Sequence, residues 1–220
     1  MKALITGSSS GIGKATASLF LERGWDVIGF DIKESTINSE RYTHYLVDIK
    51  DKASYPDVGN IDVLINNAGI QDSKSTIETN LIGTINITEH YGFSDSIKSI
   101  LFVASASAHT GAEFPLYSAG KGGLLSYMRN AAIRLAPRSV TVNSISPGGV
   151  KTDLNKPVME DEKLWNDIMK VTPMKKWATS EEIAEWIYFL TAVNKSCTGE
   201  DILIDNGETH LNATFIWPEC

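Results

Sequence analysis

The stretch ALITGSSSGIGKATASLF, residues 3–20, decides the fold class of this chain. A short apolar run comes first, a turn with three glycines follows, and apolar residues then recur at helical spacing as far as Gly24. This order predicts a strand, a glycine-rich turn and a helix. Gly7, Gly11 and Gly13 would let the backbone approach a pyrophosphate, which the N–H groups of the helix N-terminus would bind. The alternative is an ordinary turn with incidental glycines, but the position after a first strand favours dinucleotide binding.

Strand-like and helical patterns alternate along the rest of the chain. The further predicted strands are residues 27–30, 43–47, 61–65, 100–104, 140–145 and 202–204, and the predicted helices are 76–91, 115–136 and 180–192. Between the third and fourth strands, Pro56 and Gly59 predict a small or irregular connection. We therefore expect a single α/β domain, a doubly wound parallel sheet of the Rossmann type with about seven strands and helices on both faces.

Length, composition and charge narrow the class of protein. The chain has 220 residues, of which 42% are hydrophobic and 21% charged, and this is typical of one globular domain with a full core. Its formal net charge of −7 argues against a nucleic-acid or anionic-membrane binder, which would carry a basic excess. No apolar run reaches membrane-spanning length, and the first residues are too short a run for a signal peptide.

The cysteines and histidines predict neither disulfides nor a metal site. Cys197 and Cys220 lie in no CxxC or metal-ligand spacing, and so we expect free thiols in a reducing cytoplasm. The four histidines are scattered along the sequence and form no metal-binding pattern.

Asp31 directly follows the second predicted strand. An acidic residue there can accept hydrogen bonds from both adenosine ribose hydroxyls and repel a 2′-phosphate. No arginine follows it, and Ser10 rather than a basic residue precedes the second glycine of the turn. The sequence therefore favours NAD over NADP, with Lys33 as the one residue against this, and the alternative is a surface aspartate at a strand end.

Ser105, Tyr117 and Lys121 suggest acid–base chemistry. Tyr117 and Lys121 are four residues apart in a predicted helix that starts near Pro115, and so they share one face. The ammonium would lower the pKa of the phenol, which could then exchange a proton with an oxygen atom. Ser105, at the end of the fifth predicted strand, could donate to the same oxygen. A Tyr–Lys pair at this spacing also arises by chance, and so its weight depends on the rest of the chain.

Residues 150–177 have weak periodicity and several Met, Trp and Pro residues. We interpret them as a substrate loop or lid with one helix near residues 161–170; the alternative is an excursion with a satellite core. Small residues at 119, 120, 122 and 123 suggest close approach by a cofactor or a second subunit. The candidate substrate lining is mixed: Ser107, His109, Glu113, Phe114, Gly149, Leu154, Trp165 and Met174.

Five motifs, in this order, resemble those of the short-chain dehydrogenase/reductase family. They are TGSSSGIG (6–13), NNAG (66–69), YSAGK (117–121), SPGGVKT (146–152) and TGEDILIDNG (198–207). The resemblance covers nearly the whole chain. It implies Tyr117 as the acid/base, Lys121 as the residue that lowers the pKa of Tyr117 and holds the nicotinamide ribose, Ser105 as the substrate-binding serine and Asn80 as the anchor of a proton-relay water.

The resemblance also implies the cofactor and substrate contacts. The implied cofactor contacts are Gly7, Ser9, Ser10, Gly11, Ile12, Gly13, Asp31, Asp48, Ile49, Asn66, Ala68, Gly69, Tyr117, Lys121, Pro147, Gly148, Val150 and Thr152. The implied substrate contacts are Ser105, Ser107, Tyr117 and Gly149. Ser105 precedes Tyr117 by one residue fewer than is usual in the family, which makes Ser107 a rival for its role. The segments 49–60 and 70–79 are shorter than usual.

We therefore expect an NAD(H)-dependent oxidoreductase that interconverts a secondary alcohol and a ketone. The alternative is a catalytically idle dinucleotide sensor or scaffold, and an epimerase or dehydratase would need a larger substrate region. The expected partners are a small-molecule substrate and further copies of the chain in a homodimer or homotetramer, with no nucleic acid or membrane. The substrate itself stays open. The net charge disfavours an acidic carrier protein, although Lys163, Lys170, Lys175 and Lys176 could form a local basic rim.

Overall fold

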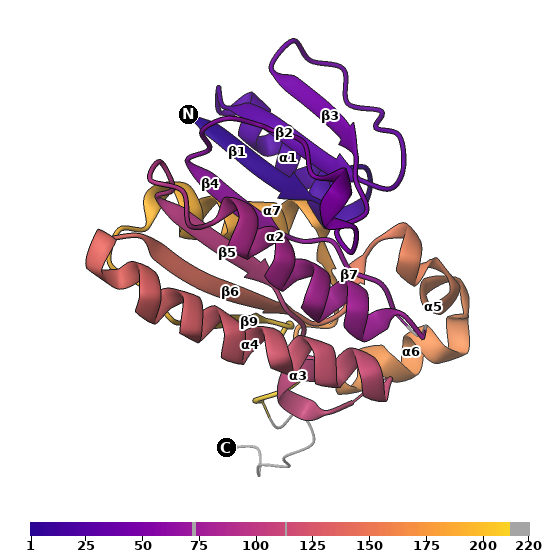
Figure 1. Cartoon of the computed structure of the whole chain (residues 1–220). Coiled ribbons are helices and arrows are strands. Elements are labelled where there is room, and N and C mark those ends of the chain that lie inside the picture. Colours follow the sequence, from indigo (N-terminus) through magenta and orange to yellow (C-terminus); the bar gives the residue numbers. More distant parts are fainter. Residues whose placement is uncertain (72–73, 113, 212–220) are drawn as a thin grey trace.

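A parallel sheet of seven strands forms the centre of the computed structural model, which describes residues 1–71, 74–112 and 114–211 (Figure 1). The spatial order is β3-β2-β1-β4-β5-β6-β9, and every neighbouring pair is parallel. The strands are β1 (Lys2–Thr6), β2 (Asp26–Asp31), β3 (Tyr42–Leu46), β4 (Val63–Asn66), β5 (Ser99–Val103), β6 (Thr141–Pro147) and β9 (Asp201–Ile204). The chain runs outward from β1 to β3 and then returns to the other side of β1. This confirms the predicted doubly wound fold.

Helices cover both faces of the sheet. The helices α2 (Thr84–Tyr91) and α4 (Pro115–Leu135) pack on one face, and α1 (Gly11–Glu22) and α7 (Ser180–Tyr188) pack on the other. Within β1, Leu4 joins the first of these cores, while Ala3 and Ile5 join the second. Because both faces of a central parallel strand are buried, such strands read as continuous apolar runs, which is why their positions could be predicted.

Two helical segments differ from the predictions. Residues 76–91 are helical as predicted, but a π-helical segment, η2 (Glu78–Gly83), interrupts them before α2 begins. A Cβ at Gly83 would lie 2.9 Å from Ile49 Cγ1, so this helix packs closely on the chain after β3. The predicted helix 180–192 likewise ends in a π-helical segment, η5 (Phe189–Val193). The connection between β3 and β4 holds one short 3₁₀ turn, η1 (Lys52–Ser54), as the sequence indicated.

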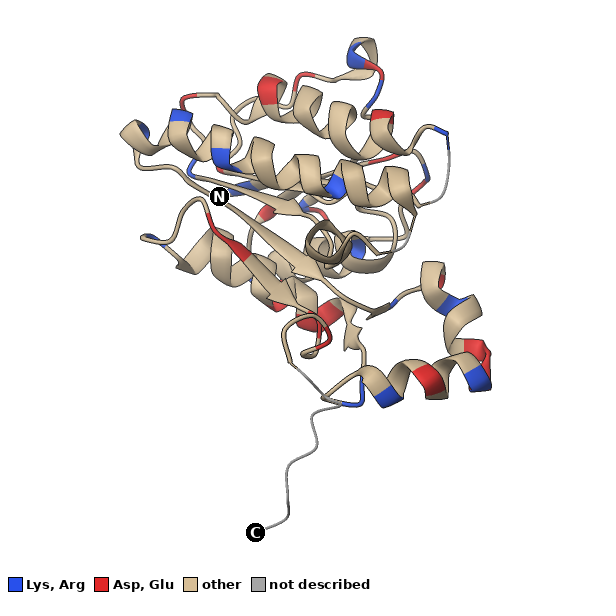
Figure 2. Cartoon of the chain, turned by 90° about the horizontal axis from the view of Figure 1, so that it is seen from below, with Lys and Arg blue, Asp and Glu red and all other residues tan. Residues whose placement is uncertain are grey.

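Residues 150–177 form an arm that projects from the carboxyl edge of the sheet (Figures 1 and 2). It contains the short strand β7 (Val150–Lys151), the turn η4 (Asp153–Asn155) and helices α5 (Lys156–Glu160) and α6 (Glu162–Val171); β8 (Ala178–Thr179) then pairs with β7. Helix α6 matches the helix predicted near residues 161–170. Its N-cap, Asp161, accepts a hydrogen bond from Leu164 N, and none of its residues is fully buried.

Several further expectations concern the chain as a whole. Within the residues described, no helix has the length and apolar character needed to cross a membrane. No group of three or more His, Cys, Asp or Glu side chains in the same ranges is placed to hold a metal ion. Cys197 is a half-buried free thiol, whereas Cys220 and Glu113 lie outside the described residues.

Candidate active site

The glycine-rich turn between β1 and α1 is shaped for close backbone approach. Gly7 and Gly11 have positive φ values of 69° and 50°, which side chains rarely tolerate. A Cβ at Gly13 would lie 2.0 Å from the carbonyl oxygen of Gly7, so only glycine lets α1 start against this strand. The N-cap, Ser10, makes no side-chain cap hydrogen bond, and so its hydroxyl does not occupy the first N–H groups of α1, which could bind an anion. The turn therefore fits the pyrophosphate of a dinucleotide.

Asn67 fastens this turn to the end of β4, a role that the sequence analysis did not assign. Its Nδ2 donates to the carbonyl oxygens of Thr6 (3.0 Å) and Gly7 (3.1 Å). The Thr6 hydroxyl accepts from the backbone N–H groups of Asn67 and Ala68 at 3.0 Å each. The position of Asn67 in the NNAG motif was the sequence feature that could have indicated this role. The preceding Asn66 is 3% exposed and its Nδ2 donates to Thr88 Oγ1 (3.0 Å), so its side chain faces the core.

Asp31 lies beside the glycine-rich turn. Its Oδ2 accepts from Ser9 N (2.9 Å) and its Oδ1 from Lys33 N (3.0 Å), while Ser9 Oγ donates to Lys33 O (2.9 Å). A carboxylate has about four acceptor positions, and so it retains capacity for ribose hydroxyls. The structure thus brings the predicted ribose acceptor to the predicted phosphate turn.

A second hydrogen-bonded chain supports the same loop. Ser8 Oγ lies 3.0 Å from Tyr42 OH, Tyr42 OH lies 3.2 Å from His44 Nδ1, and His44 Nε2 lies 2.9 Å from Lys33 O. Gly29 makes room for it, because a Cβ there would lie 2.1 Å from Tyr42 OH. The sequence gave no signal for this network, whose members come from three different segments.

Helix α4 brings Tyr117 and Lys121 together as predicted. The helix starts at Pro115, and the Lys121 Nζ lies 5.7 Å from the centroid of the half-buried Tyr117 ring. Lys121 is only 4% exposed, and its Nζ donates to Val103 O (2.7 Å) at the end of β5. A buried ammonium close to a phenol favours the phenolate by its charge. The two side chains therefore lie close together on one face of α4, with the ammonium beside the aromatic ring.

Asn80 belongs to the π-helical segment and faces the same site. Its Oδ1 accepts from Ile70 N and its Nδ2 donates to Ile70 O, both at 2.8 Å, and it is fully buried. A Cβ at Gly69 would lie 3.3 Å from Asn80 Oδ1 and 3.4 Å from Lys121 Nζ. The side chains of Asn80 and Lys121 therefore both lie next to Gly69. The side chain of Asn80 thus holds the loop after β4, and its role in a proton relay stays a prediction.

Ser105 and Ser107 are joined by hydrogen bonds, and which of the two binds a substrate stays a prediction. Both are buried, and Ser107 donates to Ser105 Oγ from its N–H (3.2 Å) and from its hydroxyl (3.0 Å). Because Ser105 Oγ accepts these bonds, its own proton is available for another acceptor. Ser107 begins the short helix α3 (Ser107–Thr110), and the preceding Ala106 N donates to Pro147 O at 2.9 Å. This places β5 and the end of β6 side by side at the site.

The predicted residues after β6 have distinct surroundings. A Cβ at Gly149 would lie 2.0 Å from Trp177, whose ring meets Trp165 of the arm edge-on with centroids 5.1 Å apart. Val150 is buried in the core, and a Cβ at Gly11 would lie 3.4 Å from Thr152 Cγ2. Gly149 therefore packs against Trp177 at the base of the arm, and Thr152 packs against Gly11 at the start of α1.

Three other predicted contacts lie toward the edges of the site. Asp48 pairs with Lys50 (3.4 Å) and is partly exposed, whereas Ile49 is buried. A Cβ at Gly148 would lie 2.8 Å from Asp205 Cβ, in the turn after β9. Burial raises the pKa of Asp205, but hydrogen bonds from Thr209 and Gly207 outweigh this and hold the pKa below its usual range.

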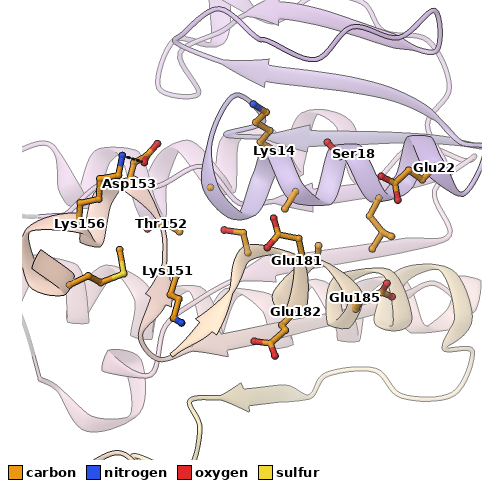
Figure 3. A pocket seen from close by; sticks show the side chains of 16 residues that line it. Lys14, Ser18, Glu22, Lys151, Thr152, Asp153, Lys156, Glu181, Glu182 and Glu185 are labelled. Carbon is orange, nitrogen blue, oxygen red and sulfur yellow. Dashed lines mark ion pairs between the residues drawn. The ribbon is translucent and has the colours of Figure 1, made fainter. Parts of the chain in front are cut away.

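A groove of about 800 Å³ lies between α1 and α7 and ends at the arm (Figure 3). Its lining includes carboxylates of both helices, among them Glu22, Glu181 and Glu185. It shares Gly11 and Thr152 with the predicted cofactor site, but neither Ser105 nor Tyr117 lines it. The groove is therefore adjacent to the phosphate turn and separate from the Tyr–Lys pair.

The fold is a doubly wound parallel α/β sheet, and the glycine-rich turn, Ser105 and the Tyr117–Lys121 pair all lie at the carboxyl ends of its strands. The family model described as Enoyl-(Acyl carrier protein) reductase matches residues 7–209. The chain belongs to the short-chain dehydrogenase/reductase family, a family of oxidoreductases.

Its similarity to individual proteins extends over nearly the whole chain. A 3-oxoacyl-[acyl-carrier-protein] reductase of Thermotoga maritima is 31% identical over 93% of this chain and 96% of its own length. The structure of a 4-hydroxyisoleucine dehydrogenase complexed with NADH superposes with a TM-score of 0.88 at 25% identity, covering 96% of this chain and 99% of the other. ElxO with NADP bound has a TM-score of 0.83 at 27% identity and covers 94% and 98%, respectively. Relatives of this chain thus bind nicotinamide cofactors of both kinds.

Proposed function

We propose that this chain is an NAD(H)-dependent oxidoreductase that interconverts a secondary alcohol and a ketone. The observation that carries the proposal is the buried Lys121, which lies beside the Tyr117 ring and is held on β5, the strand that leads to Ser105. A nicotinamide cofactor bound along the glycine-rich turn would supply or accept the hydride.

The residues of the chain would manage the proton and the charge on the substrate oxygen. In the reductive direction, Tyr117 donates its phenolic proton to the carbonyl oxygen, and in the oxidative direction it takes the proton from the alcohol. Lys121 stabilises the phenolate form through its charge. The Ser105 hydroxyl, oriented by Ser107, donates to the same oxygen and stabilises its negative charge.

The preference for NAD is part of the proposal. It is supported by Asp31, whose carboxylate lies against Ser9 of the phosphate turn, where a 2′-phosphate would meet its charge. Because relatives bind NADH or NADP, a direct comparison is needed. Calorimetric titration should give a lower Kd for NAD than for NADP, and the reverse order would contradict the preference.

We assign residues 150–177 to a substrate lid within a single domain. The contact of Trp165 with Trp177 supports this, because Trp177 in turn covers Gly149 at the end of β6. Lysines of the arm are partly neutralised by ion pairs, and this favours a small substrate over an acidic carrier protein. Lys170 pairs with Asp167 (2.7 Å), Lys176 pairs with Glu182 (2.5 Å), and Figure 2 shows both acidic and basic residues along the arm.

We also propose an isologous dimer or a dimer of dimers in the cytoplasm, without nucleic-acid or membrane partners. Helix α4 supports an assembly because it leaves Leu116 half exposed and Ile133 74% exposed. The acidic net charge supports the absence of nucleic-acid binding. Light scattering should give a mass of two or four chains, and a monomeric mass would contradict the assembly.

The decisive experiment follows nicotinamide absorbance with a panel of alcohols and ketones. Tyr117→Phe should abolish turnover and leave the Kd for NAD within about twofold, because only the proton donor is removed. Tyr188→Phe is the matched control, since Tyr188 packs against Phe20 beneath the other face of the sheet. Substantial turnover by Tyr117→Phe would contradict the proposed mechanism. Tight NAD binding without turnover by the native chain across the panel would favour the idle sensor.

A further inference from the structure

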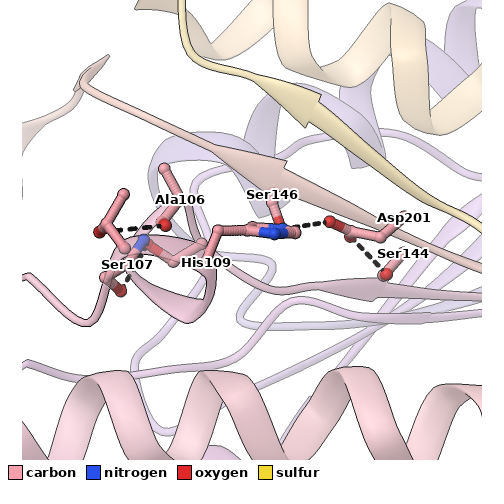
Figure 4. Close-up of polar contacts among 8 residues, drawn as sticks. Ala106, Ser107, His109, Ser144, Ser146 and Asp201 are labelled. Carbon is pink, nitrogen blue, oxygen red and sulfur yellow. Dashed lines mark hydrogen bonds and ion pairs between the residues drawn. The ribbon is translucent and has the colours of Figure 1, made fainter. Parts of the chain in front are cut away.

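A hydrogen-bonded cluster outside the Tyr–Lys pair joins helix α3 to the last two strands of the sheet (Figure 4). His109 Nε2 lies 2.7 Å from Asp201 Oδ2 and 3.3 Å from Ser146 Oγ. The other carboxylate oxygen of Asp201 accepts from Ser144 Oγ at 2.5 Å. The Asp201 side chain is 4% exposed, and Ser144 and Ser146 are fully buried. The acceptor end of the cluster is therefore built into the sheet.

The cluster is not a nucleophilic triad. In such a triad, one ring nitrogen of the histidine faces the carboxylate and the other faces the serine. Here the same nitrogen, Nε2, faces both Asp201 and Ser146. Because Asp201 as a carboxylate can only accept, Nε2–H is the donor, and this N–H exists in the neutral Nε2–H tautomer as well as in the charged ring. The arrangement is not a proton relay. It is a hydrogen bond that links α3 to the sheet, and we call it the His109–Asp201 tie.

The position of this tie in the chain gives it a consequence for the substrate site. Helix α3 has four residues, too few to be stable by itself. At its start, Ser107 donates twice to Ser105 Oγ; near its end, His109 bonds to Asp201. On the opposite side, Ser118 of α4 donates to the carbonyl oxygen of Ala112. The segment that orients Ser105 is thus held between α4 and the β6–β9 edge.

We propose that His109 is a positioning residue for the substrate-binding serine. Its bond to Asp201 fixes α3 against the sheet, and α3 in turn fixes the direction of Ser105 Oγ through Ser107. The proposal deepens the proposed function, on which the substrate-binding role of Ser105 rests. It assigns to His109 and Asp201, which are 92 residues apart, a part in the geometry of the reaction.

Two variants of His109 and one matched control test the bond between His109 and Asp201. His109→Leu removes the donor, whereas His109→Gln retains an N–H group at a similar reach. We expect His109→Leu to lower kcat/KM at least about tenfold and His109→Gln to stay within about threefold of the native chain, because a donor to a carboxylate is lost only in the first. The Kd for NAD should be unchanged in both. His90→Leu, an exposed histidine of α2, should leave kcat/KM unchanged.

A double-mutant cycle distinguishes positioning from a merely structural role. If His109 acts through Ser107, the double variant His109→Leu/Ser107→Ala loses less kcat/KM than the product of the two single losses. Multiplicative losses, or a His109→Gln variant as impaired as His109→Leu, would overturn the proposal.

Hydrogen exchange gives a measurement that does not depend on turnover. The N–H groups of Ala108, His109, Thr110 and Gly111 bond within this segment. They should exchange faster in His109→Leu than in the native chain, and not in His109→Gln. Unchanged exchange in His109→Leu overturns the tie even if the enzyme is active. Faster exchange in a chain that turns over no substrate supports the tie while the proposed reaction fails.

Discussion

The Nζ of Lys121 lies 2.7 Å from the carbonyl oxygen of Val103, so the lysine beside Tyr117 also joins helix α4 to strand β5. Lys121 is 4% exposed, and a buried ammonium is tolerated only with such partners. The bond therefore fixes the position of the charge relative to the phenol and to Ser105, which follows the same strand. One side chain thereby couples the packing of α4 to the geometry of the proposed reaction.

Replacing Lys121 by methionine should leave a folded but nearly inactive protein. The variant keeps much of the side-chain volume but removes the charge that favours the phenolate, and so turnover should fall by at least about 100-fold. Nicotinamide absorbance measures the loss, and circular dichroism checks the fold. Lys151→Met, at an exposed position of β7, is the control and should retain activity. Retention of more than a tenth of the native activity by Lys121→Met would contradict this role.

The two serines at the end of β5 should differ in their effects. Ser105→Ala removes the proposed donor to the substrate oxygen and should reduce kcat about 100-fold or more. Ser107→Ala removes only one of the two bonds that orient Ser105 Oγ, because the N–H of residue 107 remains, and should reduce kcat/KM about tenfold.

Steady-state kinetics of both serine variants with one substrate decides their order. A larger loss in Ser107→Ala than in Ser105→Ala would make Ser107 the substrate-binding residue, which is the alternative that the spacing to Tyr117 left open.

The fold could be predicted almost strand by strand because its signals are local. Buried parallel strands are apolar runs, and the glycine-rich turn has to be glycine for a steric reason that the structure confirms at Gly13. The pairing of Tyr117 with Lys121 was predictable for the same reason, since four residues in a helix place two side chains on one face.

The features that the sequence did not reveal depend on contacts between distant segments. The tie from His109 to Asp201 spans 92 positions, and nothing near either residue indicates the other. The NNAG motif contains two asparagines with opposite roles, since Asn66 faces Thr88 in the core while Asn67 holds the phosphate turn. Only the direction of each side chain from the strand end separates them, and this direction is set by packing.

Two alanine substitutions should distinguish a glycine that leaves no room for a side chain from one that could carry a side chain. In Gly13→Ala the new Cβ would meet the Gly7 carbonyl at 2.0 Å, so the turn must move, and we expect a loss of about 1–3 kcal/mol in stability. NAD binding should weaken as well, because the same turn forms the anion site.

The control is Gly122→Ala in α4, where the nearest atom lies 4.0 Å from the new Cβ. That variant should be up to about 1 kcal/mol more stable, because alanine favours the helix. Chemical denaturation of both variants measures the difference, and equal stabilities would contradict the steric argument.

Removing the charge of Asp31 should shift the cofactor preference. Asp31→Asn keeps the size of the side chain and an acceptor for one backbone N–H, but it no longer repels a 2′-phosphate. We expect the ratio of the Kd for NADP to the Kd for NAD to fall roughly tenfold, mainly through weaker NAD binding and tolerated NADP. Isothermal titration measures both constants. Asp26→Asn, at the far end of the same strand, should leave the ratio unchanged, and an unchanged ratio in Asp31→Asn would remove the basis of the NAD preference.

The carboxyl of Asp205 should make the stability of the turn after β9 depend on pH. Burial raises its pKa, and hydrogen bonds from Thr209 and Gly207 more than offset this, so that the folded pKa lies below the ordinary value of 3.8. A carboxyl with a depressed folded pKa contributes stability that is complete above about pH 5 and is lost as the pH falls through the folded pKa. Asp205→Asn places an N–H₂ group against one of the two backbone donors, and so it should cost about 1–3 kcal/mol at pH 7.

Because that contribution disappears in acid, the Tm difference between the native chain and Asp205→Asn should be largest near pH 7 and should shrink as the pH falls below about 4. Thermal melts across this range measure it. Asp95→Asn is the control, since the side chain of Asp95 is fully exposed and its substitution should shift the melting temperature little at any pH. A Tm difference for Asp205→Asn that stays constant from pH 7 to pH 3 would show that the ionised carboxylate does not stabilise this turn, and that the loss in the variant comes from packing against Gly148 instead.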